Sequence, residues 1–298
     1  MKCAAIDIGS NTVRLCAYEV KNGKLSMFLN QRVMARLGSK TQHGALTAEG
    51  INAACEALTE LRQYIDQYKI TTVFAFATAA LRNITNSKEA VSAIEQRTGF
   101  HIDLLSGEEE AYFTFFGAAE AHHITDGLIA DIGGGSTELV LIGEGQVKRA
   151  VSLPIGSLTA FVRFVGKRPA RKEQIAAIRA CVREMIETHF TGCETAKVIY
   201  GIGGAPRAAM ELEKLLYPDS GGAIPTLEQL LCRLTEDEAL AEKSILKASP
   251  ERLDTALPGV AILCEVASFF ACERLDICRA GVREGYLLRQ MESLQKEG

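Results

Sequence analysis

The chain has 298 residues, and a composition of 47% hydrophobic and 23% charged residues excludes an intrinsically disordered protein. A net charge of −4 argues against non-specific binding to nucleic acid, which requires a basic surface. The longest apolar stretch, residues 257–271, is interrupted by Gly259, Glu265 and Ser268, so no membrane span of ~20 apolar residues is expected.

The cysteines indicate the cellular compartment. There are nine, an odd number, and no two of them stand in a CxxC spacing, so the signature of a zinc or iron–sulfur site is missing. Most lie inside apolar runs, as buried free thiols do in a reducing cytoplasm. Because the first residues enter an apolar strand pattern that contains Asp7, no signal peptide is expected, and we predict a cytoplasmic protein.

The first half of the chain predicts three strands followed by alternating helices and strands. Residues 2–8, 12–20 and 24–33 have strand patterns, and Lys21-Asn22-Gly23 has the composition of a hairpin turn. Helical spacing or helix boundaries are expected at 46–68, 86–98 and 106–122, with strands at 72–77 and 101–105.

The second half repeats this design. Strands are expected at 127–132, 138–142 and 146–153, and aligning Asp7 with Asp131 gives an offset of 131 − 7 = 124 residues. Further along, helices are expected near 172–190 and 250–275, a strand at 197–201 leads into Gly203-Gly204, and a loop at 220–222. The repeat predicts two related α/β domains, residues 1–124 and 125–298.

Each domain has a glycine-containing turn after its first strand, Asp7-Ile8-Gly9-Ser10-Asn11 and Asp131-Ile132-Gly133-Gly134-Gly135. Such turns let backbone N–H groups approach a phosphate, and Ser10, Asn11, Thr12, Ser136 and Thr137 add side-chain donors. Asp7 and Asp131 stand where a carboxylate could hold Mg²⁺ through water. Asp-Gly turns are also common loop punctuation, but two matching turns favour phosphate binding. Both turns lead into another strand, which is the actin-like pattern and neither a Walker A loop nor a dinucleotide fingerprint.

An acidic segment, Ser106-Gly107-Glu108-Glu109-Glu110, opens the helix expected at 106–122. Ser106 and Glu109 have the spacing of a capping box, and Glu108 suits the positive end of the helix dipole. Glu110 lies beyond the cap. From its spacing alone it is either a general base for a water that attacks phosphorus or a solvated surface residue.

Several motifs together resemble the exopolyphosphatase and guanosine pentaphosphate phosphohydrolase (Ppx/GppA) family, in its short, two-domain form. The resemblance covers nearly the whole chain and rests on AIDIGSNT from Ala5, ATAALR from Ala77, SGEEEA from Ser106, DIGGGSTE from Asp131, GIGG from Gly201, Pro258-Gly259 and AGVREG from Ala280. It implies two duplicated actin-like (ribonuclease H-like) ATPase domains of α/β class, with a cleft between the domains in which a phosphate chain is bound.

The resemblance also implies roles for residues. Glu110 would be the general base, and Asp131 and Glu138 would organise Mg²⁺ and the attacking water, with Asp7 as a further metal residue from its turn. The expected substrate-binding residues are Ser10, Asn11, Thr12, Arg82, Gly133, Gly134, Gly135, Ser136 and Thr137. Arg82 suits this role because guanidinium binds phosphate oxygens bidentately, although a cation at a helix end is the structural alternative.

Other features have weaker assignments. Ala205-Pro206 follows the GIGG motif where the family more often has Thr, so this motif is either a nucleotide contact or only a phosphate turn or hinge. Arg252 and Arg283 are further candidate phosphate contacts, and the basic run 166–172 either guides a polyanion or is a solvated helix start. A homodimer is expected from the resemblance.

The sequence thus predicts an enzyme, a Mg²⁺-dependent exopolyphosphatase that releases orthophosphate from the end of inorganic polyphosphate. Guanosine pentaphosphate is the alternative substrate, because it also ends in a phosphoanhydride. A phosphotransferase and a non-enzymatic nucleotide-binding module on the same fold are more distant alternatives. The related iron–sulfur activators are disfavoured by the missing CxxC.

Overall fold

The computed structural model describes residues 1–21 and 24–297, which form two compact units. Unit 1 comprises Met1–Ala121 with Ala280–Gly298, and unit 2 comprises His122–Arg279. The first boundary lies close to the expected one at 124/125, but the residues from Ala280 onward join unit 1 and not the second domain. The predicted Asn22-Gly23 turn lies outside the described residues, and the cleft expected between the domains stays a prediction.

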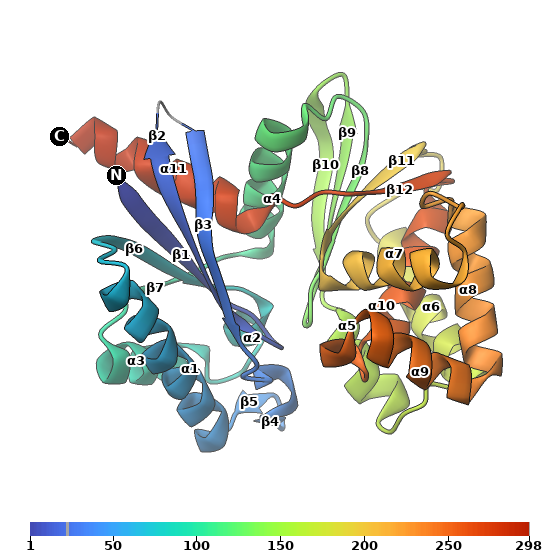
Figure 1. The fold of residues 1–298 in the computed structure, drawn as a ribbon, viewed down its shortest axis with the longest axis horizontal. Helices are drawn as coiled ribbons and strands as arrows, with labels where there is room; N and C mark the ends of the chain where they lie inside the picture. The colour runs from blue at the N-terminus through green and yellow to red at the C-terminus, as the bar shows by residue number, and fades with distance from the viewer. Residues whose placement is uncertain (22–23, 298) are drawn as a thin grey trace. The chain divides into compact units, whose positions relative to one another are not determined.

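Unit 1 is a five-stranded sheet with helices on both faces (Figure 1). Its strands are β1 (Lys2–Ile8), β2 (Val13–Lys21), β3 (Lys24–Val33), β6 (Thr72–Ala77) and β7 (Ile102–Leu104), with a small hairpin of β4 (Thr41–Gln42) and β5 (Ala45–Leu46) beside them. Its helices are η1 (Leu37–Ser39), α1 (Ala48–Gln67), α2 (Ala79–Arg82), α3 (Ser87–Thr98), α4 (Gly107–His122) and α11 (Val282–Glu297).

Unit 2 repeats the five-stranded sheet and adds more helices. Its strands are β8 (Gly127–Ile132), β9 (Thr137–Gly143), β10 (Gln146–Leu153), β11 (Val198–Gly203) and β12 (Arg274–Ile277). Its helices are α5 (Ser157–Ala160), η2 (Phe161–Val165), α6 (Lys172–Glu187), α7 (Gly204–Leu216), α8 (Ile224–Glu236), α9 (Glu238–Ala248), η3 (Pro250–Arg252) and α10 (Ala256–Phe269).

The two sheets confirm the predicted duplication. Their strand orders are β3-β2-β1-β6-β7 and β10-β9-β8-β11-β12, with the first three strands antiparallel and the remaining pairings parallel. The registers also match across the 124-residue offset: Asp7 faces Arg14 across β1 and β2, and Asp131 faces Glu138 across β8 and β9. The glycine turn therefore follows the same strand of the same sheet in both units.

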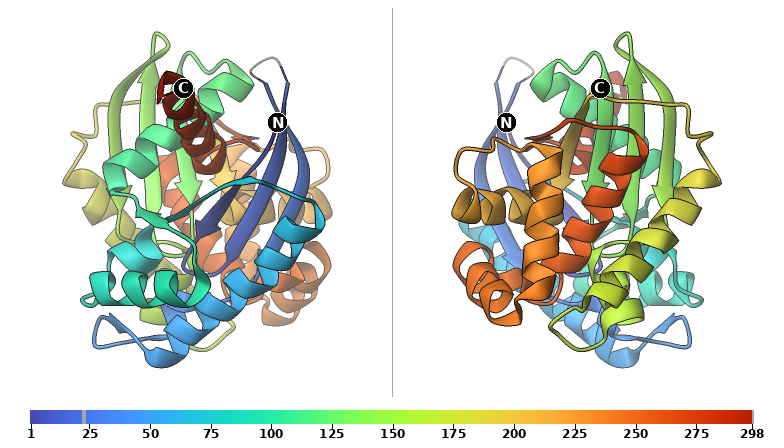
Figure 2. Two further views of the ribbon diagram at one scale, coloured as in Figure 1. Left: turned by 90° about the vertical axis from the view of Figure 1, so that its left-hand side faces the viewer. Right: turned by 90° about the vertical axis from the view of Figure 1, so that its right-hand side faces the viewer.

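Alternation along β1 divides unit 1 into two cores. Ala4, Ile6 and Ile8 pack with the helices α1 and α3, whereas Cys3 and Ala5 pack with residues of α11 on the opposite face. Both faces of β1 are buried, which explains its almost continuous run of apolar residues. Figure 2 shows the helices of each unit from two further sides.

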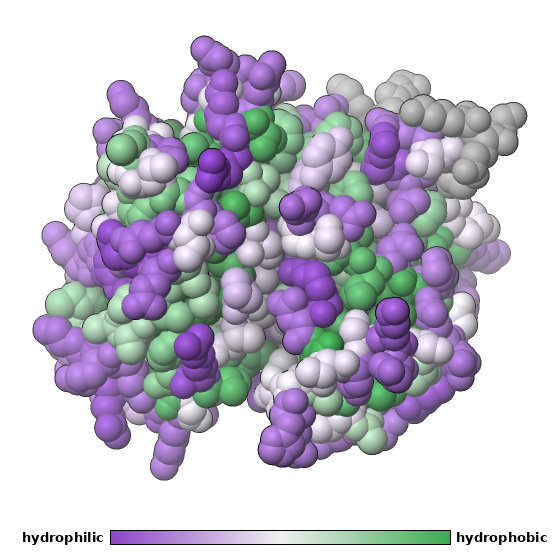
Figure 3. Space-filling view, turned by 180° about the vertical axis from the view of Figure 1, so that it is seen from behind, coloured by the Kyte–Doolittle hydropathy of each residue, from purple (hydrophilic) through white to green (hydrophobic). Residues whose placement is uncertain are grey.

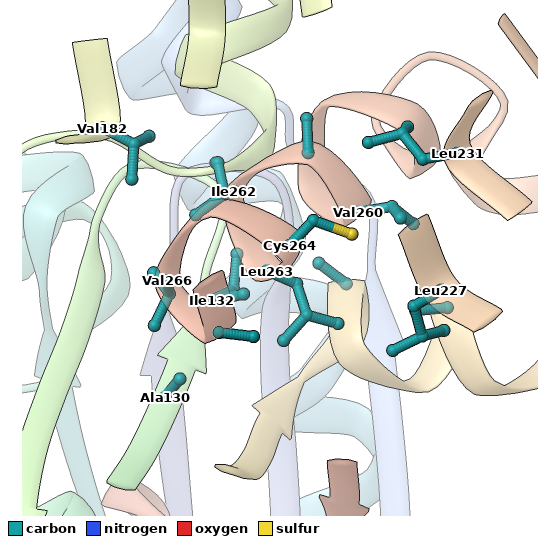
Figure 4. Packing of buried hydrophobic residues seen from close by; sticks show 14 of the residues in the cluster. Ala130, Ile132, Val182, Leu227, Leu231, Val260, Ile262, Leu263, Cys264 and Val266 are labelled. Carbon is teal, nitrogen blue, oxygen red and sulfur yellow. The ribbon is translucent and has the colours of Figure 1, made fainter. Parts of the chain in front are cut away.

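Helix α10 is the core of unit 2. Its residues from Ala256 to Ala267 are all buried, because α5, α6, α7, α8 and β8 surround it. Figure 4 shows its side chains Val260, Ile262 and Leu263 among residues of β8, α6 and α8.

The prediction of a single helix at 250–275 is wrong at both ends of that range. The helix proper begins only at Ala256, and after Phe269 the chain turns at Ala271, whose φ of 52° is left-handed. Leu275 then lies in β12, a parallel edge strand beside β11. An apolar run of this kind cannot by itself separate a buried helix from a buried strand.

Helix α11 completes unit 1 although it comes last in the sequence. It packs on β1, and its first turn crosses α4 so closely that a Cβ on Gly117 would lie 2.2 Å from the carbonyl oxygen of Gly281. A Cβ on Gly285 would lie 2.0 Å from the carbonyl oxygen of Phe113. Only glycines allow this approach of two backbones, so the AGVREG motif has a packing role in unit 1.

The face of the molecule seen from behind is largely polar (Figure 3). Figure 3 shows hydrophilic side chains over much of the face seen from behind, interrupted by smaller apolar patches. Within residues 1–21 and 24–297, no helix has the length and the apolar character needed to cross a membrane.

Candidate active site

The predicted site residues fall into two groups, one in each unit. Unit 1 holds the turn at residues 7–12 together with Arg82 and Glu110, and unit 2 holds the turn at 131–137 together with Glu138.

The same backbone hydrogen bond closes the glycine turns of the two units. The N–H of Gly9 donates to the carbonyl of Thr12 at 3.1 Å, and the N–H of Gly133 donates to the carbonyl of Ser136 at 3.0 Å. A Cβ on either glycine would lie 3.2 or 3.3 Å from that same carbonyl oxygen, which is a tight fit. The duplication therefore extends to the hydrogen bond that closes each turn.

Neighbouring backbone N–H groups hold the carbonyls of each turn. In unit 1, the carbonyls of Ser10 and Asn11 accept from the N–H groups of Gly38 and Arg36 at 2.9 and 3.0 Å. In unit 2, the carbonyls of Gly133 and Gly134 accept from the first residues of α5, at 2.9 to 3.0 Å. These bonds fix the backbone of each turn from the side of its carbonyls.

Arg82 and Glu110 lie in direct contact. Arg82 ends α2, and its Nη1 donates to the carboxylate of Glu110 at 2.7 Å and to the carbonyl of Leu105 at 2.9 Å. Both side chains are largely buried, with 18% and 8% of their surfaces exposed. Glu110 is therefore not the solvated surface residue that its spacing left open.

The start of α4 explains how Glu110 reaches this position. The capping box is confirmed: the N–H of Glu109 donates to Ser106 Oγ at 3.1 Å, and the N–H of Ser106 donates to the Glu109 carboxylate at 2.8 Å. With Glu109 turned back to the cap, Glu110, about 100° further round the helix, faces the protein. The helix dipole stabilises a carboxylate in this first turn.

Asp7 also has a partner that its sequence position did not reveal. Nη1 of Arg283, from the start of α11, donates to Asp7 Oδ2 at 3.1 Å, and both side chains are mostly buried. Burial raises the pKa of Asp7 although Arg283 and Arg14 oppose the shift. Burial alone would lower the pKa of Arg283, but the charges of Glu284 and Asp7 raise it overall. Asp7 is thus one half of a buried ion pair.

Arg283 is fixed by its neighbour in the sequence. Glu284 is buried, accepts a hydrogen bond from Tyr18 Oη at 2.5 Å, and accepts another from the N–H of Gly281 at 2.9 Å. These bonds attach the first turn of α11 to β2. Arg283, expected as a candidate phosphate contact, is instead placed against Asp7.

In unit 2 the residue opposite the turn aspartate is acidic. Asp131 and Glu138 are cross-strand partners, so their side chains lie on the same face of the sheet. Glu138 is 2% exposed and accepts a hydrogen bond from Ser152 Oγ at 2.8 Å. Two adjacent carboxylates of this kind attract a cation.

The donor set of unit 2 fits Mg²⁺ better than a structural metal. Across the described residues there is no cluster of three or more His, Cys, Asp or Glu that could hold an ion, which argues against an all-protein site. Mg²⁺ instead uses one or two carboxylates and takes its other ligands from water and phosphate, which matches Asp131 and Glu138. Asp7 fits less well, because its carboxylate already bonds a guanidinium.

The hydroxyl-bearing residues of the second turn divide in two. Ser136 is 4% exposed at the turn itself, whereas Thr137 is fully buried and donates its hydroxyl to the carbonyl of Ile155 at 2.7 Å. The Thr137 side chain therefore ties β9 to the segment before α5 and is not directed to a ligand. Ser157, which sequence reasoning missed, donates its hydroxyl to the Gly133 carbonyl at 3.0 Å. Its signal was a Gly-Ser pair after the third strand of the repeat.

The GIGG motif lies beside the second turn. A Cβ on Gly203, whose φ is +91°, would lie 2.8 Å from Asp131 Oδ1. A Cβ on Gly204 would lie 1.5 Å from Nη2 of Arg252, so the guanidinium occupies the space of a side chain there. The structure thus brings Asp131, this motif and Arg252 together within unit 2.

The basic run at 166–172 has acidic partners. Arg168 contacts Glu242 at 3.2 Å and Asp254 at 3.1 Å, and Lys172 lies 3.9 Å from Glu236. Two of the four cations of this run thus lie beside carboxylates, which weakens its attraction for a polyanion.

Comparison with known proteins gives concordant matches over almost the whole chain. The model of the Ppx/GppA phosphatase family matches residues 17–294. An uncharacterized protein of Streptomyces coelicolor is 29% identical, with 98% of this chain and 91% of the relative covered. Exopolyphosphatase 1 of Mycobacterium tuberculosis is 25% identical, with 98% and 89% covered.

Solved structures agree with this assignment. The Ppx/GppA family member of Aquifex aeolicus is 25% identical and superimposes with a TM-score of 0.78, covering 99% of this chain and 98% of that one. An exopolyphosphatase from Cytophaga hutchinsonii has a TM-score of 0.85 at 20% identity, with 98% of both chains covered, and shows the shared fold. The protein has the duplicated actin-like fold of these structures, and it belongs to the Ppx/GppA phosphatase family.

Proposed function

We propose that this protein is an exopolyphosphatase, which hydrolyses the terminal phosphoanhydride of inorganic polyphosphate and releases orthophosphate. The observation that carries the proposal is the buried contact between Arg82 and Glu110, at 2.7 Å. Family membership supports a phosphatase, and the Mycobacterium relatives named exopolyphosphatase 1 support polyphosphate as the substrate.

Arg82 has the chemistry to bind the end of a phosphate chain. Its guanidinium is always charged and can make two parallel hydrogen bonds to phosphate oxygens. In the described structure one of its nitrogens bonds Glu110. A phosphate with two negative charges competes for this guanidinium, so substrate binding draws Arg82 away from Glu110 and frees the carboxylate.

Glu110 then acts as the general base. It accepts a proton from the attacking water while the water oxygen forms a bond to the terminal phosphorus. The bond from that phosphorus to the bridging oxygen breaks, and the chain leaves one phosphate shorter, with the bridging electrons on its new end. Arg82 and the N–H groups of the turn at residues 7–12 stabilise the charge on the transferred group.

Asp131 and Glu138 are the residues that we expect to hold Mg²⁺. A bound Mg²⁺ would neutralise phosphate charge and so supply part of the stabilisation that phosphoryl transfer needs. Ser152, which donates to Glu138, keeps that carboxylate in place. The homodimer and the cytoplasmic location expected from the sequence remain predictions.

The test is phosphate release by purified Glu110→Gln, with Glu109→Gln as the matched control. Loss of a general base lowers turnover by about 100- to 10,000-fold, so Glu110→Gln should fold normally and lose turnover to that extent. Glu109→Gln should retain both folding and turnover, because Gln also closes a capping box. Near-normal turnover in a folded Glu110→Gln variant would refute the role.

The same assay, run in parallel on long-chain polyphosphate and guanosine pentaphosphate with Mg²⁺, decides the substrate. Preference for polyphosphate supports the proposal, and preference for the nucleotide replaces it with a guanosine pentaphosphate phosphohydrolase. If neither substrate releases phosphate, a phosphotransferase or a non-enzymatic nucleotide-binding module takes its place.

A further inference from the structure

Unit 1 anchors one arginine against its glycine turn from a distant part of the chain. Arg283 stands 276 residues after Asp7, yet its Nη1 bonds the Asp7 carboxylate at 3.1 Å. The helix that carries it is locked in place by the close glycine contacts with α4 and by the bond from Tyr18 to Glu284. The ion pair is therefore a built feature of unit 1.

The guanidinium of Arg283 forms an ion pair with Asp7 but does not satisfy all of its hydrogen-bond donors. Its Nε–H is buried and has no hydrogen-bond partner within the described part of the chain. An arginine with a purely structural role would be expected to have a partner for this N–H group, since an unpaired buried donor destabilises the fold. The feature that this arrangement provides is the positive charge of Arg283 beside the Asp7 carboxylate.

The cross-strand partner of the turn aspartate has opposite charges in the two units. Asp131 faces Glu138, whereas Asp7 faces Arg14 and also bonds Arg283. The same hydrogen bond closes both turns, but the residue across from the turn aspartate differs in charge between them.

We propose that Arg283 is a positioning residue, which neutralises Asp7 and fixes the turn at residues 7–12 as a binding site for phosphate oxygens and not for a metal ion. This inference rests on the proposed function for its substrate class. Without Arg283, the Asp7 carboxylate would repel phosphate from the turn and would be free to bind a cation.

Calorimetry tests the proposal without turnover, with inorganic tripolyphosphate as one probe and Mg²⁺ alone as the other. Arg283→Gln should weaken tripolyphosphate binding in the absence of Mg²⁺ by about tenfold or more, because a buried charge is left unpaired beside the turn. The double variant Asp7→Asn/Arg283→Gln should recover most of that loss, because it removes both charges. Asp7→Asn should leave Mg²⁺ binding unchanged.

Two further variants separate charge from packing. Tyr18→Phe removes the bond that anchors Glu284 but keeps the charge of Arg283, so it should lower thermal stability and weaken tripolyphosphate binding much less than Arg283→Gln does. Arg283→Lys keeps the charge and should bind tripolyphosphate more tightly than Arg283→Gln, which keeps the test valid if the Gln variant folds poorly.

Three results would overturn the inference. They are wild-type tripolyphosphate affinity in Arg283→Gln, loss of Mg²⁺ binding in Asp7→Asn, and failure of the wild-type protein to bind tripolyphosphate without Mg²⁺. A wild-type protein that binds tripolyphosphate but releases no phosphate from any substrate would instead refute the proposed function and leave this inference standing.

Discussion

The glycine turns of the two units are closed by the same hydrogen bond but lie in different electrostatic environments. In both, a glycine N–H closes the turn onto the carbonyl three residues later, at 3.1 Å in unit 1 and 3.0 Å in unit 2. The turn aspartate has an arginine as its cross-strand partner in unit 1 and a glutamate in unit 2. The charged residues around the turn aspartate, and not the turn itself, are thus expected to decide whether the position favours an anion or a cation.

This difference shows how a duplicated fold can divide its chemistry. Strand order and register are conserved between the units, because they are set by the buried faces of the sheets. One residue on the neighbouring strand changes the local charge without disturbing either feature. The motif Asp-Ile-Gly therefore predicts a turn well and predicts its ligand poorly.

The largest effect is expected from exchanging the two cross-strand charges for neutral groups. Glu138→Gln should lower phosphate release by about a hundredfold and raise the Mg²⁺ concentration that is needed, because one of two adjacent carboxylates is lost. The equivalent Arg14→Gln should lower release by no more than about fivefold and leave the Mg²⁺ requirement unchanged. Titrating activity against Mg²⁺ for both variants measures this, and equal shifts in the Mg²⁺ requirement would break the comparison.

A smaller effect is expected on stability from glycines around the turns. Gly9→Ala and Gly133→Ala should each cost about 1 kcal/mol or less, since the new Cβ meets one carbonyl oxygen at 3.2 or 3.3 Å. Gly156→Ala should cost about 2–3 kcal/mol, because its Cβ would lie 2.6 Å from the backbone of Gly134. Urea unfolding gives the three values. If Gly133→Ala destabilised the protein as much as Gly156→Ala does, and Gly9→Ala did not, the two turns would be less alike than their closing hydrogen bonds suggest.

The smallest effect is expected at the two helix starts. Ser106→Ala, which removes the N-cap hydroxyl of α4, should lower the free energy of unfolding by about 1 kcal/mol. In unit 2, Thr159 Oγ1 accepts from the N–H of Gly156 at 2.8 Å, and Thr159→Ala should cost about the same or less. Thermal unfolding of the two variants compares their stabilities. Unchanged phosphate release in Thr159→Ala would show that the substitution leaves the neighbouring glycine turn intact.

Local signals in the sequence predicted much of the fold. The capping box at Ser106 and Glu109, the helix expected at 86–98 and the repeat offset of 124 residues all depend on residues close together in the chain or on pattern alone. The helix expected up to Leu275 was wrong because its apolar residues suit a buried helix and a buried strand equally well.

The site was less accessible to sequence reasoning, because its pairings are long-range. The sequence placed Arg82 and Glu110 on separate helices, and only the fold brings them to 2.7 Å. Asp7 and Asp131 stand in the same Asp-Ile-Gly motif, and Asp7 bonds an arginine 276 positions further along the chain. Composition and spacing carry no signal for a partner at that distance.

The position of α11 has a consequence for how the molecule is made. A ribosome completes residues 122–279, a continuous unit with its own core, before it adds the helix that packs on β1. Until then Asp7 and Tyr18 lack their partners and one face of the first sheet is uncovered. The unit whose synthesis begins first is thus expected to be the last to reach its native state, and the intermediate that chaperones would meet is an open N-terminal sheet attached to a folded unit 2.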